Sequence, residues 1–148
     1  MINPKRLLII LPVLVAMSCG NDDESASATV DAGPFKIDLP EGWQFVEAQG
    51  YDSYVANFLT PSGETVSFDL GMYSNSLNVD SNTHDIAFKT IDNKTAKIVS
   101  PKNAGHGTTG VFFESIDANS NRFGMSGSNL TQASQVQLLA AIETIKFK

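Results

Sequence analysis

Several residue types and patterns that define whole classes of protein are scarce in this chain of 148 residues. It has one cysteine, so no disulfide can form within the chain. Its two histidines fall short of the several His, Cys or acidic ligands that a zinc site usually takes. Ten Lys and Arg residues face sixteen Asp and Glu residues, which argues against nucleic-acid binding because that binding requires neutralisation of phosphates. The longest apolar run stops after about a dozen residues, short of the roughly twenty that cross a membrane.

Residues 1–18 have the build of a secretory signal. Lys5 and Arg6 precede an apolar run over residues 7–17, and the chain turns polar soon afterwards. Residues 15–20 (Val-Ala-Met-Ser-Cys-Gly) resemble the lipobox of bacterial lipoproteins, in which a small residue precedes a cysteine that is diacylated and becomes the first residue. The small residue here is Ser18, although alanine stands two residues earlier where leucine is usual. The resemblance implies cleavage before Cys19, which then carries the lipid.

Two other interpretations of this segment stay open. Residues 26–28 (Ala-Ser-Ala) form an ordinary cleavage site that would release a soluble secreted domain, and an uncleaved N-terminal anchor is the second option. The acidic cluster at residues 22–24 resembles the surface-export signal of Bacteroidota lipoproteins, but it equally suits a solvated tether. Gly20 differs from the aspartate that retains lipoproteins in the inner membrane of enteric bacteria. The expected location is therefore the outer membrane of a bacterial cell envelope, with the cell surface as an alternative.

The chain is expected to contain three regions. They are a lipoprotein signal peptide over residues 1–18, an acidic and Ser/Ala-rich tether over 19–32, and one globular domain over 33–148, which is enough chain for one domain. Loss of Lys5 and Arg6 with the signal leaves eight cations against sixteen acids, a net charge near −8. This charge argues against an electrostatic membrane patch, so the lipid on Cys19 is the expected membrane contact.

Apolar residues alternate with polar ones in several short segments, which predicts β-strands. The segments are residues 34–40, 54–59, 65–70, 95–100, 110–116 and 122–128. Residues 54–59 and 65–70 flank a loop with Pro and Gly, which predicts an antiparallel hairpin. Residues 74–85 are polar and predict a surface loop, while residues 85–90 are ambiguous.

From Thr131 the apolar spacing changes to three and four residues, which predicts an amphipathic helix with Thr131 or Ser134 as its N-cap. The expected apolar stripe contains Ala133, Val136, Leu139, Ala140 and Ile142. The last residues, 144–148, alternate again. The expected fold class is α+β, an antiparallel sheet packed with helices that include this C-terminal amphipathic helix.

Two short motifs resemble the Mog1/PsbP/DcrB-like group of proteins. One is Pro-Glu-Gly-Trp at residues 40–43, after an opening strand, and the other is Ile-Lys-Phe at residues 145–147, behind the C-terminal helix. The resemblance spans about residues 33–148 and implies an α/β/α sandwich around a central antiparallel sheet. It implies little about activity, because members of the group serve as accessory and partner-binding proteins and a fold alone assigns no function.

No set of catalytic residues converges in the sequence. Residues 105–110 match Gly-x-Gly-x-x-Gly, but a strand follows where a dinucleotide site needs a helix N-terminus, so no nucleotide is expected. No Gly-x-Ser-x-Gly occurs. The acidic loop at Asp80 lacks the glycine and glutamate of a calcium loop. His84 and His106 are expected to be solvated loop residues, and no metal or cofactor is predicted.

These observations favour a non-catalytic binding or accessory module for a protein or envelope component. A small envelope hydrolase is an alternative, and it requires His84 and His106 to share one pocket with an acid such as Asp85. A carbohydrate-binding module is another, and it requires aromatic side chains exposed on one concave face. The candidate binding aromatics are Trp43, Tyr51, Tyr54 and Tyr73. Trp43 also suits the role of a lid on the core behind the first strand.

Overall fold

The computed structural model describes residues 27–148, which form two antiparallel sheets and one helix. The elements are β1 (Ser27–Asp31), β2 (Phe35–Pro40), β3 (Gln44–Glu47), β4 (Tyr54–Leu59), β5 (Thr65–Gly71), β6 (His84–Ile91), β7 (Lys94–Pro101), β8 (Thr108–Phe113), β9 (Arg122–Ser128), α1 (Gln132–Ile142) and β10 (Lys146–Phe147). The predicted signal peptide and Cys19 lie outside the described residues.

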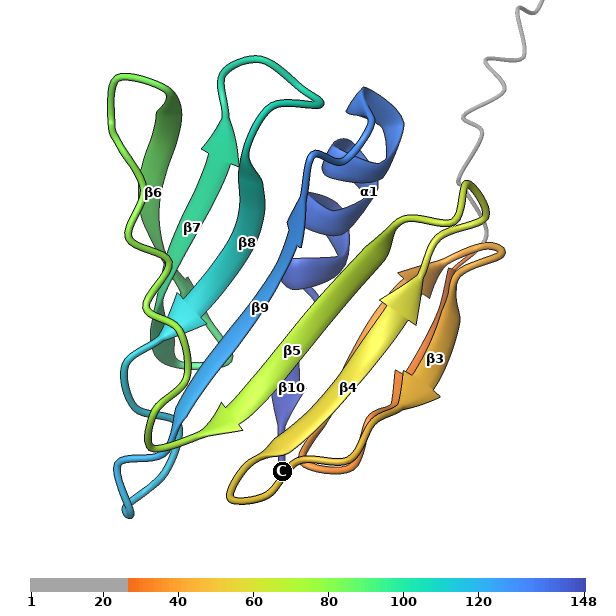
Figure 1. Cartoon of the computed structure of the whole chain (residues 1–148). Helices are drawn as coiled ribbons and strands as arrows, with labels where there is room; N and C mark the ends of the chain where they lie inside the picture. Colours follow the sequence, from red (N-terminus) through yellow and green to blue (C-terminus); the bar gives the residue numbers. More distant parts are fainter. Residues whose placement is uncertain (1–26) are drawn as a thin grey trace, which may run out of the picture.

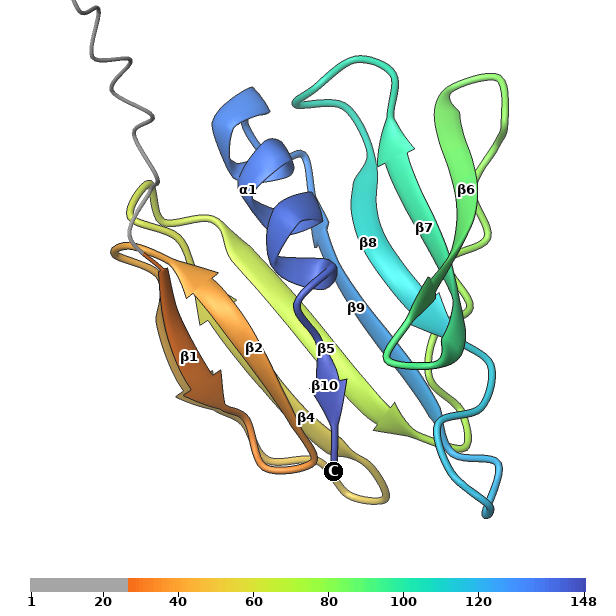
Figure 2. The same cartoon turned by 180° about the vertical axis from the view of Figure 1, so that it is seen from behind.

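The larger sheet has seven strands in the order β3-β4-β5-β9-β8-β7-β6, and the smaller has three in the order β1-β2-β10. Figure 1 shows the open side of the large sheet, and Figure 2 shows the opposite side, where α1 and the small sheet lie side by side against it. We call the covered side the inner face and the other the outer face. The hairpin predicted over residues 54–70 is confirmed as β4 paired with β5.

Phenylalanine rings on the inner face join the two sheets. Phe35 of β2 is fully buried, and its ring meets those of Phe68 and Phe123 edge-on at centroid distances of 4.9 Å. Ile37 and Leu39 follow Phe35 at the alternate positions of β2 and are also buried, as their spacing predicts. The alternation visible in the sequence therefore marks the core of the domain.

Helix α1 begins where the sequence predicts, but it buries a different stripe. The Thr131 hydroxyl accepts the Ser134 backbone N–H at 3.3 Å and caps the helix. The buried positions are Ser134, Gln135, Leu138, Ala141 and Ile142, and the prediction for the exposed Ala133, Val136 and Ala140 was wrong. A distant residue contacts the start of the helix, because Glu64 of the β4–β5 loop accepts hydrogen bonds from the Thr131 backbone N–H and the Ser134 hydroxyl and so holds Ser134 toward the sheet.

Part of the expected tether is a strand. Residues 27–31 form β1, which pairs along its whole length with β2, and Ala32 is fully buried. Val30 packs against the core, and the Lys148 ammonium lies 2.6 Å from the carboxylate of Asp31. The Ser/Ala-rich composition resembles a linker, but these contacts place the start of the domain before residue 33.

The ambiguous segment at residues 85–90 belongs to β6. All eight residues of β6 pair with β7 across a tight turn. Asp92 and Asn93 form that turn with φ values of 48° and 60°, the left-handed conformation that a two-residue type I′ turn requires. Asp and Asn accept this conformation more readily than most residues, which makes the turn compatible with the sequence.

The expectation of helices on both faces is wrong for residues 27–148. The one helix, α1, lies on the inner face, and on the outer face a segment without helix or strand crosses the sheet (Figure 1). We call residues 72–83 the outer strap. Leu77 and Val79 are the strap residues that pack in an apolar cluster with the sheet. Its Ser- and Asn-rich sequence cannot supply the apolar stripe of a packed helix.

Candidate binding groove

The outer strap is fixed to the sheet by side-chain hydrogen bonds. Ser74 is buried, and its hydroxyl lies 2.9 Å from the carbonyl oxygen of Asp69 and 3.2 Å from that of Arg122. Further along, the Lys97 ammonium donates to the carbonyl oxygen of Ser76 at 3.1 Å. Leu77 is buried in a cluster with two residues of β7 and β8. The strap is therefore an ordered wall on the outer face.

Gly124 allows the strap to approach the sheet closely. A Cβ atom at this position of β9 would lie 2.9 Å from the carbonyl oxygen of Asn75, closer than real Cβ contacts. Gly124 pairs directly with Asp69 of β5 in the sheet. The absence of a side chain at Gly124 thus brings the strap alongside Asp69.

A groove of about 350 Å³ lies between the strap, β4, β5, β9 and the chain after β3. Its lining consists of Ala48, Val55, Ala56, Asn57, Ser67, Phe68, Asp69, Asn75, Leu77, Gly124 and Ser126. We call it the outer groove. The sheet register explains its floor, because directly paired residues share a face: Asn57 lies opposite Ser67, and Ser67 lies opposite Ser126.

Asp69 is the unsatisfied polar group of the outer groove. Its Oδ1 is buried and has no hydrogen-bond partner among residues 27–148. The residues directly opposite it, Val55 and Gly124, offer no side-chain donor. By contrast, Asn57 already accepts the Ser67 hydroxyl at 2.7 Å. The groove therefore contains one carboxylate with a covered, unpartnered oxygen, between an amide–hydroxyl pair and apolar walls.

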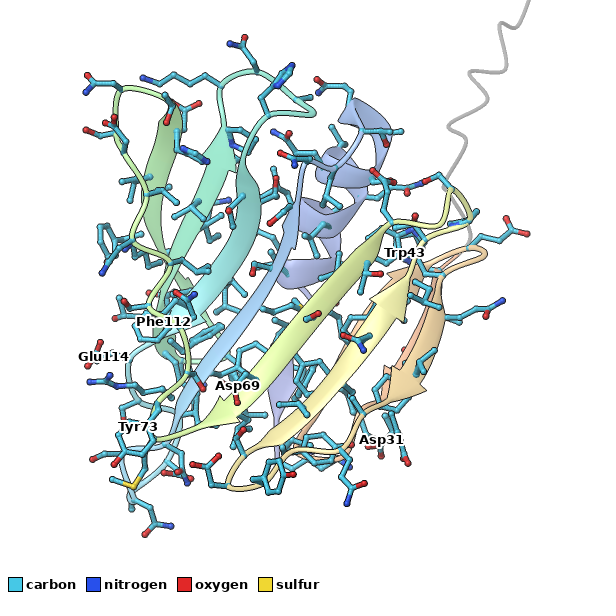
Figure 3. The ribbon with its side chains drawn as sticks, in the orientation of Figure 1. Asp31, Trp43, Asp69, Tyr73, Phe112 and Glu114 are labelled. Atoms are coloured by element: carbon cyan, nitrogen blue, oxygen red, sulfur yellow. The ribbon has the colours of Figure 1, made fainter. Side chains whose placement is uncertain are left out.

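A second hollow of about 250 Å³ lies on the other side of the strap, over β6, β7 and β8. Phe88, Lys97, Phe112 and Glu114 contribute to its lining. Glu114 binds Arg122 at 2.8 Å, and Lys97 is held by the strap, so the charges of this hollow are paired or bound. Figure 3 shows Glu114 on the far side of the strap from Asp69, while Phe112 packs against Leu77 of the strap.

The four aromatic residues predicted as a binding platform do not come together. Trp43 is buried, and its indole N–H donates to the Gln137 side chain at 3.1 Å, which favours its interpretation as a lid on the core. Tyr54 packs against Phe68 with ring centroids 5.7 Å apart. Tyr51 and Tyr73 are exposed. Trp43 and Tyr73 lie at opposite ends of the sheet in Figure 3.

The two histidines do not form a catalytic pair in the described part of the chain. Nε2 of His84 accepts the Thr108 backbone N–H at 3.1 Å, and Nδ1 lies 2.9 Å from the Thr83 hydroxyl. His106 is exposed in the β7–β8 loop. Asp85 follows His84 directly in β6, so its side chain points to the opposite face. No hydrogen bond joins either histidine to an acid within residues 27–148.

The glycine-rich motif, metal ligands and membrane-spanning helices remain to be placed in the structure. Residues 105–107 of the glycine-rich motif lie in the β7–β8 loop, and residues 108–110 already belong to β8 rather than to a helix. Within residues 27–148, no cluster of three or more His, Cys, Asp or Glu side chains is placed to hold a metal ion. No helix of that region is long and apolar enough to cross a membrane.

Sequence reasoning missed Asp69 and the outer groove. Asp69 occupies a polar position of the alternating strand 65–70, where a solvated carboxylate is the ordinary expectation. Nothing in the local sequence signals that one of its oxygens will be buried without a partner. The nearest signal is Gly124 within a strand, since a glycine there often marks the close approach of another backbone.

No family model matches the chain, and no curated protein matches it. Among solved structures, the solution structure of cyanobacterial PsbP (CyanoP) from Synechocystis sp. PCC 6803 is similar, with a TM-score of 0.50. The fold is PsbP-like. The match covers 88% of this chain and 98% of that chain at 10% sequence identity, which establishes a likeness of fold alone. The PsbP-like domain inferred from residues 40–43 and 145–147 is thereby confirmed as a fold.

Proposed function

We propose that this protein is a lipid-anchored binding module of the bacterial cell envelope, and that its outer groove holds a basic side chain of a partner protein. The anchor is inferred from the lipobox-like segment that ends at Cys19. The binding role is carried by one observation, the buried and unpartnered Oδ1 of Asp69 in the outer groove.

A buried acceptor without a partner costs about 1–3 kcal/mol, and more when it is charged. A lysine or arginine donor that enters the groove and displaces the groups covering Oδ1 would recover that cost through a charge-assisted hydrogen bond. Apolar groups of Ala48, Val55 and Leu77 line the same groove and suit the methylene stem of such a side chain. The net charge near −8 of the mature chain would also attract a basic partner.

The size of the groove argues for a single side chain or a short segment. At about 350 Å³ it lies near the lower end of ligand pockets, which run from about 300 to 1,000 Å³. A free aromatic stacking surface, which a sugar site would use, is not part of its lining, since Phe68 is buried beneath it. The carbohydrate-binding alternative therefore has weaker support than a basic protein segment.

The test is an NMR titration of the chain with acetyl-arginine-amide, read from backbone amide shifts. Shifts are expected at Asp69, Gly124 and Ser126, and they should be lost in Asp69→Asn. Glu41→Gln removes a charge from an exposed turn and is the matched control, which should retain the shifts. Shifts produced by N-acetylglucosamine but not by the arginine probe would replace this proposal with the carbohydrate-binding one.

The anchor has a separate test. Intact mass of the protein extracted from membranes should equal residues 19–148 plus acyl chains, and Cys19→Ser should release the protein from the membrane fraction. Protease treatment of whole cells then distinguishes the cell surface from the inner side of the outer membrane. A mass that begins at Thr29 without lipid would instead identify an ordinary secreted domain.

A further inference from the structure

Strand β6 ends the large sheet, and its outer edge meets no other strand in the part of the chain that the structure describes (Figure 1). Six of its eight residues are exposed. They include Ile86 and Phe88, of which Phe88 is 69% exposed. An edge strand of this length, without proline or bulge, is a template for pairing with another strand.

The turn between β6 and β7 determines which backbone groups of β6 face outward. Because Asp92 and Asn93 form a two-residue type I′ turn, Ile91 and Lys94 close the hairpin as a hydrogen-bonded pair. Bonding to β7 then alternates along β6. The odd-numbered residues bond β7, and the even-numbered residues from 86 to 90 direct their N–H and C=O groups away from it.

We propose that β6 pairs with β6 of a second copy of this chain, antiparallel and about a two-fold axis at Ala87. Residues whose N–H and C=O groups point away from β7 must pair with one another across the new interface. The two-fold axis therefore passes through a residue and not between two residues. The central candidates are Ile86, Ala87 and Phe88. The axis at Ala87 is the one of these three that places Asp85 opposite Lys89 of the second copy.

This register is complementary on both faces of the joined sheet. On the outer face, Ile86 lies opposite Phe88 of the second copy, and the symmetry repeats the apolar pair. On the inner face, Asp85 meets Lys89 of the second copy, also twice. Lys89 already forms an ion pair with Glu143 of its own chain, so Asp85 joins that pair at the edge of the sheet. At the positions next to the axis, each charged side chain thus faces one of opposite charge, and each apolar side chain faces another apolar one.

A single strand pair buries less surface than the roughly 1,200 Å² of a stable complex, so the dimer is weak in dilute solution. Confinement to a membrane through the proposed lipid raises the effective concentration of the chains and favours pairing. The appropriate test therefore uses the full chain in its native membranes and traps the contact covalently.

Ala87→Cys supplies that trap. In the proposed register, residue 87 faces itself as a non-hydrogen-bonded pair, with Cα atoms about 4.5 Å apart, which suits a disulfide. Thr90→Cys is the matched control on the same exposed edge. In the proposed register the thiols of the two copies would be six residues apart along the strands, roughly 20 Å. The parent chain, whose one cysteine is Cys19, measures the background.

Under mild oxidation, Ala87→Cys should form a disulfide dimer about tenfold faster than Thr90→Cys. In the Ala87→Cys chain, Asp85→Lys should slow the reaction, and addition of Lys89→Asp together with Glu143→Lys should restore it, because opposite charges then face each other both between the copies and within each chain. Similar rates for the two cysteine variants, or no restoration by the added charge changes, would overturn the proposal. A mixed disulfide of Ala87→Cys with a different protein, in place of the dimer, would overturn it as well.

Discussion

Glu64 connects the β4–β5 loop to the first turn of α1, and its contribution to stability can be sized from its hydrogen bonds. Burial raises the pKa of the Glu64 carboxyl, but hydrogen bonds outweigh burial and lower the pKa from 4.5 to about 2. The donors are the hydroxyls of Ser134, Ser62 and Thr60 and the backbone N–H of Thr131. The Thr131 bond is 2.5 Å long and the Thr60 bond 3.2 Å.

Because the folded-state pKa of Glu64 lies below its unfolded value, the stabilisation is complete above about pH 4.5 and is lost as the pH falls toward 2. At about 1.4 kcal/mol for each pH unit between these two values, the upper bound is about 3.5 kcal/mol. Glu64 is only partly buried, and solvent screens part of the interaction. We therefore expect Glu64→Gln to lower the free energy of unfolding at pH 7 by about 1.5–2 kcal/mol.

Urea unfolding, followed by the fluorescence of the single tryptophan Trp43, measures this free energy. The difference between the parent and Glu64→Gln should be largest at pH 7, shrink below pH 4.5 and disappear near pH 2. Glu41→Gln, at an exposed turn, should behave like the parent throughout. Equal free energies for the parent and Glu64→Gln at pH 7, or a difference that does not change with pH, would refute the reasoning.

Three further substitutions test the core, the strap and the groove. Phe35→Ala removes a fully buried ring that contacts both sheets and should cost about 3–5 kcal/mol in urea unfolding. Gly124→Val should displace Asn75 and lower the free energy of unfolding by about 1–3 kcal/mol. It should also expose residues 72–83 to limited proteolysis, and an unchanged digestion pattern would contradict the close approach of the strap. Asp69→Thr removes the unpartnered carboxylate and should raise the free energy of unfolding by about 1 kcal/mol, while a loss of stability would mean that Asp69 supports the fold.

The helix and the aromatic residues show where local patterns stop being informative. The spacing after Thr131 predicts α1 and its cap, but Val136 is 56% exposed although it belongs to the expected stripe. The start of α1 is held by Glu64, which lies 67 residues away in the sequence from Thr131. Trp43 and Tyr73 are both candidate binding aromatics by sequence, and the fold buries Trp43, in line with its alternative role as a core lid, and exposes Tyr73.

The sequence by itself determined six of the strands (β2, β4, β5, β7, β8 and β9), the C-terminal helix and the PsbP-like likeness. Alternation and capping are local properties, so a window of a few residues contains the information. The tertiary structure alone decided that residues 27–31 join the small sheet, that the strap lies on Gly124, and that Asp69 loses solvent at one oxygen. These outcomes depend on which distant segment covers a given face. Side-chain periodicity identifies the residues that share a face, but it carries no information about the segment that packs against it.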